Sequence, residues 1–342
     1  MQIRFAVNIG LHFVQHQPTI FSPTCEMKNQ PKSIDLNISA VSKGIGMNNY
    51  EKVYFKSKAV GRLSSHNLNE LKTTLIDIDR GRRSLRKNID ADNALLDKLK
   101  SELSWINWFP LRLFFKRKIE SKTQAITKTS EALIKLKQDY ERHKLGLEVS
   151  LSGQLEAAFG TLDDTYSEII NTKKVWDITT SQPIDRVAQR TTAHNIIERK
   201  EVHLKRTSNS KIQCDYKALH FENANGGDLY IFPQFLFIEK DDDLALIDLL
   251  DIELDFSLTK FIESETVPSD TKIIDHTWAK SNKDGSRDKR FADNYQIPIV
   301  RYGELHLKSK SGLNEVYMTS NPESAHAFKK MFDEYKEVLA NS

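Results

Sequence analysis

The chain is poor in cysteine and has no long apolar run. Its 342 residues include two cysteines, Cys25 and Cys214, which lie far apart and outside any C-x-x-C pair. This argues against a disulfide framework and favours two free thiols in a reducing compartment. No stretch of about 18 uncharged apolar residues occurs, so no membrane-spanning helix is expected. The first ten residues alternate apolar and polar, which favours a strand over a signal peptide. We therefore expect a cytoplasmic protein.

Motifs that mark common catalytic and metal sites are also missing. The sequence contains no G-x-S-x-G, no P-loop, no G-x-G-x-x-G after a strand and no H-E-x-x-H. The acidic run 239–243 lacks the spacing of an EF-hand and is typical of a solvated turn. We expect no catalytic residue, no cofactor and no metal, and hence a protein that is not an enzyme.

Charge is divided unevenly along the chain. The net charge is +3, but residues 1–211 contain 35 Lys and Arg against 23 Asp and Glu, whereas residues 212–342 contain 15 against 24. The two parts therefore have net charges of +12 and −9. Such polarity indicates either an anionic partner for the first part or docking of the two parts on each other.

The first 148 residues suggest a β-rich module followed by a helical hairpin. Residues 1–62 contain short alternating apolar runs and turn signals, which predict a small N-terminal β-module. From residue 63 to 148 the apolar period changes to alternating steps of three and four, typical of a coiled coil. Its seam consists of Leu68, Leu71, Leu75, Ile78, Leu85, Ile89, Leu96, Leu99, Leu103 and Ile106, then Ile119, Ile126, Leu133, Leu136, Tyr140 and Leu147.

Pro110 interrupts this pattern between its two halves. Because proline lacks a backbone N–H and clashes with the preceding turn, one continuous helix is excluded there. The pattern predicts two antiparallel arms of nearly forty residues, each about 50–60 Å long.

The predicted hairpin tip, residues 105–118, combines aromatic and basic side chains. The residues that we expect to contact a partner or a membrane are Trp105, Trp108, Phe109, Arg112, Phe114, Phe115, Lys116, Arg117 and Lys118. So many exposed aromatic groups predict that something covers the tip. Three possibilities remain for what buries the tip: this chain or a second copy of it, a protein partner, or an anionic membrane surface.

The second half of the chain is predicted to be a helical connector followed by a β-domain. Residues 149–211 form the connector, and residues 212–342 contain short apolar strands, strong turn signals and a final amphipathic helix that Pro322 opens. The fold class is thus α+β, with a long antiparallel helical hairpin between a small N-terminal β-module and a C-terminal β-domain that one helix caps.

Residues 212–342 resemble the pleckstrin-homology-like fold in their order of strands and final helix. Segments 226–237 and 276–285 are similar to those of uncharacterised bacterial proteins with such a domain. The resemblance implies a barrel or sandwich that binds proteins or lipids without catalysis. Acidic residues at 239 and 241–243 replace the basic mouth of phosphoinositide-binding members, which favours protein binding.

A second basic cluster interrupts the acidic C-terminal region. It consists of Lys280, Lys283, Arg287, Lys289 and Arg290 around the turn signal Asp284-Gly285. Such a cluster either contacts an anion such as a nucleic-acid phosphate or forms a solvated hairpin loop. The sequence favours the loop, so nucleic acid is a weaker candidate partner.

Taken together, these patterns predict a non-enzymatic scaffold or adaptor that binds partner proteins through the hairpin tip and the C-terminal domain. One alternative is a peripheral protein, located at the inner membrane, that inserts residues 105–118 into an anionic leaflet. Another is a nucleic-acid effector that uses loop 280–290. The long seam also suggests a homo-oligomer.

Overall fold

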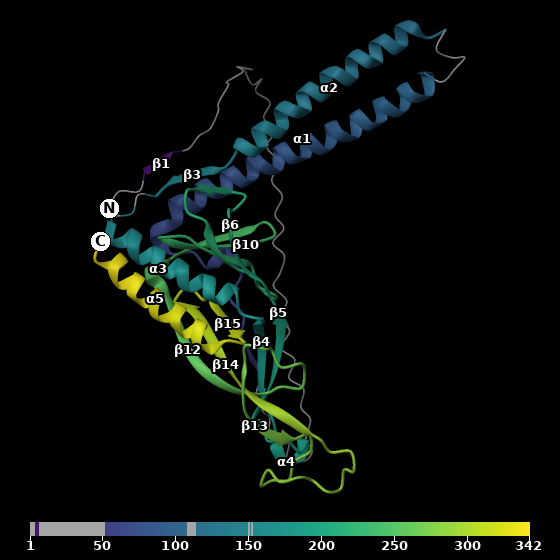
Figure 1. Ribbon diagram of the computed structural model, residues 1–342. Helices are drawn as coiled ribbons and strands as arrows, with labels where there is room; N and C mark the ends of the chain where they lie inside the picture. The colour runs from purple at the N-terminus through teal and green to yellow at the C-terminus, as the bar shows by residue number, and fades with distance from the viewer. Residues whose placement is uncertain (1–3, 7–51, 108–113, 150, 152) are drawn as a thin grey trace, which may run out of the picture.

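The computed structural model describes residues 4–6, 52–107, 114–149, 151 and 153–342, and mixes helices with sheets (Figure 1). Its α-helices are α1 (Asn69–Asn107), α2 (Lys116–Arg142), α3 (Gly153–Ile170), α4 (Arg186–Gln189) and α5 (Pro322–Ala340). Short 3₁₀-helices occupy Val60–Arg62, His66–Leu68 and Leu249–Asp251. No helix within the described ranges is both long and apolar enough to cross a membrane.

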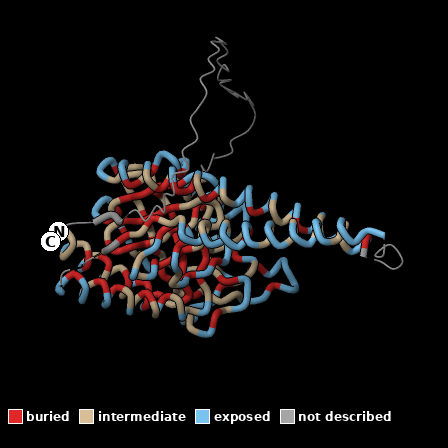
Figure 2. Tube along the Cα trace, turned by 90° about the horizontal axis from the view of Figure 1, so that it is seen from above, coloured by how far each residue is buried: buried red, intermediate tan, exposed pale blue. Residues whose placement is uncertain are grey.

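Helices α1 and α2 lie side by side and run in opposite directions, projecting from the rest of the molecule (Figures 1 and 2). Glu102 near the end of α1 pairs with Lys122 near the start of α2. At the opposite end of the pair, Arg82 of α1 donates to the carbonyl oxygens of Tyr140 and His143 at the end of α2, at 2.9 and 3.0 Å. The prediction of two antiparallel helices is therefore confirmed, although not the predicted end of the second one.

The predicted seam faces the helix–helix contact. Ile89 and Leu96 of α1 are buried with Leu133 of α2, and Ile126 and Leu136 pack against them. Arg82, a polar residue between the seam positions Ile78 and Leu85, is buried as well. Its guanidinium stacks 4.1 Å from the Tyr140 ring centroid and donates to two carbonyl groups. The remaining seam positions of α1 are buried or half-buried.

The second arm is shorter than the seam predicts. Helix α2 has 27 residues, or about 40 Å at 1.5 Å per residue, against 39 residues and about 58 Å for α1. Leu145 and Leu147 belong instead to strand β3 (Leu145–Glu148), where both are buried in a cluster with Phe232 and Phe237. Two leucines separated by one residue share one face of a strand, so a sheet buries both.

Strand β3 connects the base of the hairpin to a three-stranded sheet. It pairs antiparallel with β1 (Arg4–Ala6) and parallel with β7 (Ile212–Cys214). The other described strand from the predicted N-terminal module, β2 (Val53–Tyr54), pairs with β4 of a different sheet. Residues 1–3 and 7–51 of that module lie outside the described residues.

Two larger sheets form the body. The five-stranded sheet has the order β11 (Asp243–Asp248), β10 (Phe235–Lys240), β9 (Asp228–Ile231), β8 (Ala218–Phe221) and β6 (Leu204–Thr207). The seven-stranded sheet has the order β12 (Ile252–Ile262), β14 (Gln296–Ser309), β15 (Asn314–Thr319), β4 (Val175–Pro183) and β2, with β13 (Lys272–Trp278) beside β14 and β5 (Asn195–Glu201) beside β4.

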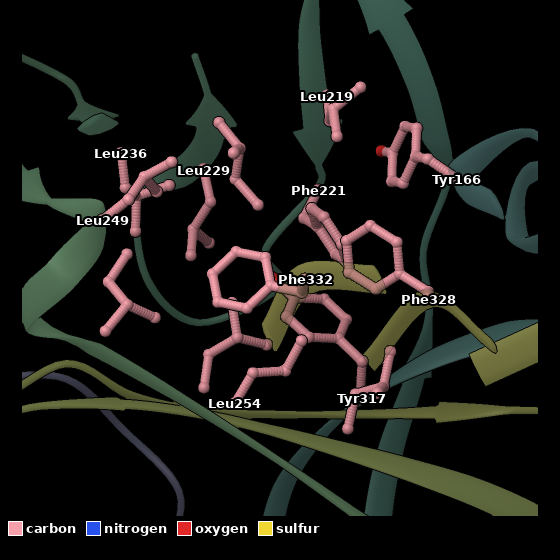
Figure 3. Packing of buried hydrophobic residues seen from close by; sticks show 14 of the residues in the cluster. Tyr166, Leu219, Phe221, Leu229, Leu236, Leu249, Leu254, Tyr317, Phe328 and Phe332 are labelled. Atoms are coloured by element: carbon pink, nitrogen blue, oxygen red, sulfur yellow. The ribbon is translucent and has the colours of Figure 1, made fainter. Parts of the chain in front are cut away.

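The main core lies where these two sheets meet helices α3 and α5, which pack against each other (Figures 1 and 3). Figure 3 shows Tyr166 of α3 beside Phe221 of β8 and Phe328 of α5, with ring centroids 5.3 and 5.6 Å from that of Tyr166. Helix α5 begins as predicted at Pro322, where the Asn321 side chain accepts from two backbone N–H groups. Such a cap satisfies donors that the first helical turn leaves free.

The structure does not confirm a pleckstrin-homology-like barrel. Strands from residues 212–342 are divided among three sheets, none of which closes in the described parts of the chain. Two of these sheets also include strands that precede residue 212, because β6 pairs with β8, and β4 pairs with β15. Helix α3, from the predicted connector, shares its core with α5. The coarser prediction, helices together with C-terminal sheets, is confirmed.

Candidate functional sites

The hairpin tip presents aromatic side chains to solvent. Trp105, on the last turns of α1, is 70% exposed, and Phe114, just before α2, is 81% exposed. Phe115 is partly exposed, whereas neighbouring Ile106 is buried in the hairpin. Trp108, Phe109 and Arg112 lie outside the described residues. The other described parts of the chain thus leave the aromatic groups at 105 and 114 uncovered.

Three exposed cations follow these aromatic groups in the first turn of α2: Lys116, Arg117 and Lys118. No acidic residue lies in this turn, and no side chain caps the helix at Phe115. Because free N–H groups make a helix start electropositive, cations there are unfavourable. The Lys118 ammonium lies 5.8 Å from the Phe115 ring centroid. The described part of the tip therefore combines apolar surface with three cations that form no ion pair with the described residues.

The predicted basic loop lies at the far end of the molecule from the hairpin, beyond β13 and near α4 (Figure 1). Its centre is Asp288, which is 2% exposed and accepts from Arg190 at 2.9 Å and from two nitrogens of Arg290 at 2.9 and 2.8 Å. Hydrogen bonding to Arg290 is the main cause that lowers the pKa of this carboxyl.

Backbone contacts give the same loop a fixed shape. Asn294 accepts from the backbone N–H of Lys280 at 3.0 Å and donates to its carbonyl oxygen at 2.6 Å. Gly285 has φ of 84°, which favours glycine at this predicted turn. Arg287 stacks 5.2 Å from the Trp278 ring centroid.

The five predicted cations of this loop divide into two groups. Arg287 and Arg290 are engaged within the loop. Lys280, Lys283 and Lys289 are exposed and form no ion pair with the described residues. The cluster is thus a structured loop with three free lysines, and whether it binds anions stays a prediction.

Sequence reasoning missed a pair of buried carboxyl groups between the two large sheets. Asp177 of β4 and Glu315 of β15 are 0% and 1% exposed, and Asp177 is the cross-strand partner of Tyr317. Because residues two apart on a strand share a face, Glu315 and Tyr317 project from the same side of β15. Tyr317 belongs to the main core, so these acids lie at its margin.

Each of these groups has one polar atom that forms no hydrogen bond of normal geometry with the described residues. Asp177 Oδ2 accepts from the backbone N–H of Ala224 at 2.8 Å, but Oδ1 has no partner. Glu315 Oε1 accepts from the Ser57 backbone N–H at 3.2 Å and from its hydroxyl at 2.5 Å. Oε2 forms no hydrogen bond of normal geometry with the described residues, but the Asn223 side chain lies close enough to lower the pKa of Glu315 by hydrogen bonding. The Tyr317 hydroxyl is also unpartnered.

Burial raises the pKa of both carboxyl groups. Loss of water raises the pKa of Asp177 to about 6, against the opposing effect of the Ala224 hydrogen bond. For Glu315, loss of water and the nearby charge of Asp177 raise the pKa to about 7, although hydrogen bonds from Ser57 oppose the rise. Near neutral pH, these two buried carboxyl groups can therefore gain or lose a proton. Buried groups that titrate in this range are typical of functional sites.

A cavity of about 470 Å³ adjoins Glu315. Its walls come from residues 56–60, which lead to the hairpin, from loop 225–227, from the β10–β11 turn 240–243, and from Leu63, Leu229, Ile238 and Leu313. We call it the Glu315 cavity. The sequence signal was an acidic residue, Glu315, beside the apolar run 316–318 of strand β15. Which face of this strand is buried depends on how the two large sheets pack, and the sequence alone does not show that.

A third polar cluster is fully paired. Arg199 of β5 lies between the rings of Trp176 and Phe261, at 4.1 and 4.4 Å from their centroids, and donates to both oxygens of Glu263 at 2.9 and 2.8 Å. The Tyr302 hydroxyl also donates to Glu263, at 2.6 Å. These contacts fix the seven-stranded sheet and leave no group free for chemistry.

Metal coordination finds no support in the described ranges, which contain no group of three or more His, Cys, Asp or Glu that could hold an ion. Comparison of the chain with protein-family models, curated proteins and solved structures finds no match in any of the three.

Proposed function

We propose that this chain is a non-enzymatic adaptor that binds a partner protein through the hairpin tip. The observation that carries the proposal is the exposure of Trp105 and Phe114 at the end of two helices that hold them away from the body. Burial of apolar surface contributes about 25 cal/mol per Å². Aromatic groups and arginine are enriched at the centres of protein interfaces.

The tip also indicates the chemistry of the partner. Lys116, Arg117 and Lys118 stand at an electropositive helix start without an acidic neighbour in that turn. Carboxylate groups on a partner would relieve this repulsion. The expected partner surface is therefore an apolar groove with an acidic rim. The proposal does not depend on a barrel in residues 212–342.

Photo-crosslinking tests this proposal in the cells that produce the protein. A benzoylphenylalanine at position 114 should form one adduct of discrete mass with another protein. The matched control places the same group at Ile134, which is 58% exposed on the side of the hairpin, and should form none. The adduct at 114 should also disappear when Trp105 is replaced by serine. Equal adducts at both positions, or none at 114, would contradict the proposal.

A peripheral membrane protein is the second candidate, because exposed aromatic groups beside cations also suit an anionic leaflet. Co-sedimentation with vesicles that contain phosphatidylserine separates the two candidates. Binding that is lost in Trp105→Ser and at high salt would favour the membrane. An adaptor should remain in the supernatant. Light scattering on the same sample tests whether a second copy covers the tip.

A further inference from the structure

A second cavity, of about 350 Å³, lies on the face of the seven-stranded sheet that points away from the main core. On β14, Leu305 and Leu307 belong to that core, whereas the alternate residues Glu304, His306 and Lys308 line the cavity. We call it the Glu304 cavity. Its other lining residues are Phe55, Ile178, Ser181, Asn195, Ile197, Asp255, Phe256, Ser257, Thr259 and Val316.

Strand register brings hydroxyl and ionisable groups together in the Glu304 cavity. Ser257 of β12 is directly opposite Glu304 of β14, and Asp255 is opposite His306. Opposite residues on neighbouring strands share a face, as do residues two apart on one strand, so Thr259 lies on this face too. The site therefore depends on the pairing of β12 with β14 and not on a local motif.

Among the described residues, four ionisable side chains line the cavity, and three of them contribute no net charge. Lys308 donates to Asp255 Oδ2 at 3.1 Å, so their charges cancel. Burial is the main cause that lowers the pKa of His306 from its usual value, and its ring is therefore neutral at pH 7. The fourth group is Glu304. Burial raises its pKa, and hydrogen bonds from two hydroxyl groups of β12 oppose the rise. A single carboxyl group that two hydroxyl donors already contact is a weak basis for selecting a charged ligand.

The uncharged polar groups of the lining both donate and accept hydrogen bonds. The hydroxyl groups of Ser181, Ser257 and Thr259 each have one donor and two acceptor positions, and the Asn195 amide has both kinds of group. The apolar part of the lining consists of Phe55, Ile178, Ile197, Phe256 and Val316. The cavity therefore suits a neutral ligand that has several hydroxyl groups and an apolar face.

We propose that the Glu304 cavity binds a sugar ring, whose hydroxyl groups exchange hydrogen bonds with Ser257, Thr259 and Asn195 and whose C–H groups contact the apolar side chains. A sugar hydroxyl donates and accepts, as do the groups that line the cavity. A volume of about 350 Å³ lies near the lower end of the range of small-molecule sites, which favours a single ring. A free sugar and the end of a glycan share this chemistry. The cavity is separate from the hairpin tip, so the sugar site stands or falls independently of the adaptor proposal.

The probes are D-glucose, D-galactose, D-mannose and N-acetyl-D-glucosamine, each titrated at pH 7 into the full chain and followed by saturation-transfer NMR. At least one should bind with a Kd in the millimolar range. Cyclohexanol, an apolar ring with one hydroxyl group, should bind at least about tenfold more weakly. The 6-amino-6-deoxy and 6-phosphate forms of the best binder, which add a charge of either sign, should be weaker by a similar factor. Equal binding of its methyl glycoside indicates the end of a glycan, and loss of binding indicates a free sugar.

Paired substitutions locate the binding. Ser257→Ala combined with Thr259→Ala removes two hydroxyl groups of the lining and should weaken sugar binding about tenfold, because two hydrogen bonds are lost. The matched control is Thr123→Ala combined with Thr127→Ala, which removes two exposed hydroxyl groups from α2, outside the cavity, and should leave sugar binding unchanged.

A second lining pair, Ser181→Ala combined with Asn195→Ala, lies on β4 and β5 and should also weaken binding. It tests the site without any change to β12. No binding of any of the four neutral sugars at tens of millimolar, equal binding of cyclohexanol, or tighter binding of either charged form would overturn the proposal. So would unchanged binding in both lining variants, or an equal loss in the α2 control.

Discussion

Replacing Glu315 by glutamine should change how the stability of the protein depends on pH. Glutamine has nearly the same shape and keeps an oxygen that accepts from Ser57, but it carries no titratable proton. In the wild type, Glu315 is almost completely buried and burial raises its pKa to about 7. The substitution therefore removes the ionisation of this side chain and preserves its packing.

The magnitude follows from the difference between the folded and unfolded pKa. Each pH unit corresponds to about 1.4 kcal/mol. A rise from 4.5 to about 7 therefore disfavours the folded state by about 3 kcal/mol once the group is ionised. Ionisation of Glu315 destabilises the folded state because the folded chain binds this proton more tightly than the unfolded chain does. The contribution of Glu315 is most favourable below pH 4.5 and is lost as the pH rises through about 7.

Urea unfolding of wild type and Glu315→Gln at pH 5, 6, 7 and 8 measures this effect. The stability of the variant relative to the wild type should increase from pH 5 to pH 8 by about 2.5 kcal/mol, because part of the effect is already present at pH 5. Stability curves that remain parallel across this range would refute the assignment of a raised pKa to Glu315.

Four further substitutions test other parts of the structure. Arg199→Ala should lower the free energy of unfolding by about 3–5 kcal/mol in urea titrations, because it strands the buried Glu263 carboxylate; a loss below 1 kcal/mol would count against the ion pair. Arg82→Ala should cost about 2 kcal/mol and increase amide exchange at the end of α2, because two carbonyl groups lose their donor. Asp288→Asn should speed proteolysis within loop 279–295; an unchanged cleavage rate would contradict its central role. Trp105→Ser should change stability by less than about 0.5 kcal/mol, since this side chain is exposed, and a larger loss would mean that the tip is packed.

Helices whose apolar residues recur every three or four positions could be predicted from the sequence. The seam of α1 and the apolar stripe of α5 each depend on neighbours three or four residues away, and Pro110 and Pro322 marked their ends. The turn at Gly285 likewise depends on its immediate neighbours. Local periodicity therefore identified the helices and the tip without knowledge of the sheets.

Long-range pairing could not be predicted in this way. Leu147 fits the heptad spacing, seven residues after Tyr140, but a parallel partner at Ile212–Cys214 made a strand more favourable there. The acid pair escaped notice for the same reason. Asp177 and Glu315 are 138 positions apart, and only the pairing of β4 with β15 brings them to one face. The resemblance to the pleckstrin-homology-like fold implied a barrel or sandwich, but the order of strands does not reveal which sheet each strand joins.

Hydroxyl-radical footprinting of the purified chain tests the central claim, that the hairpin holds an uncovered aromatic tip away from the body. Trp105 and Phe114 should be oxidised rapidly, and buried Trp176 should be oxidised slowly. The rates should be independent of protein concentration if no second copy covers the tip. Protection of Trp105 equal to that of Trp176 would contradict the account.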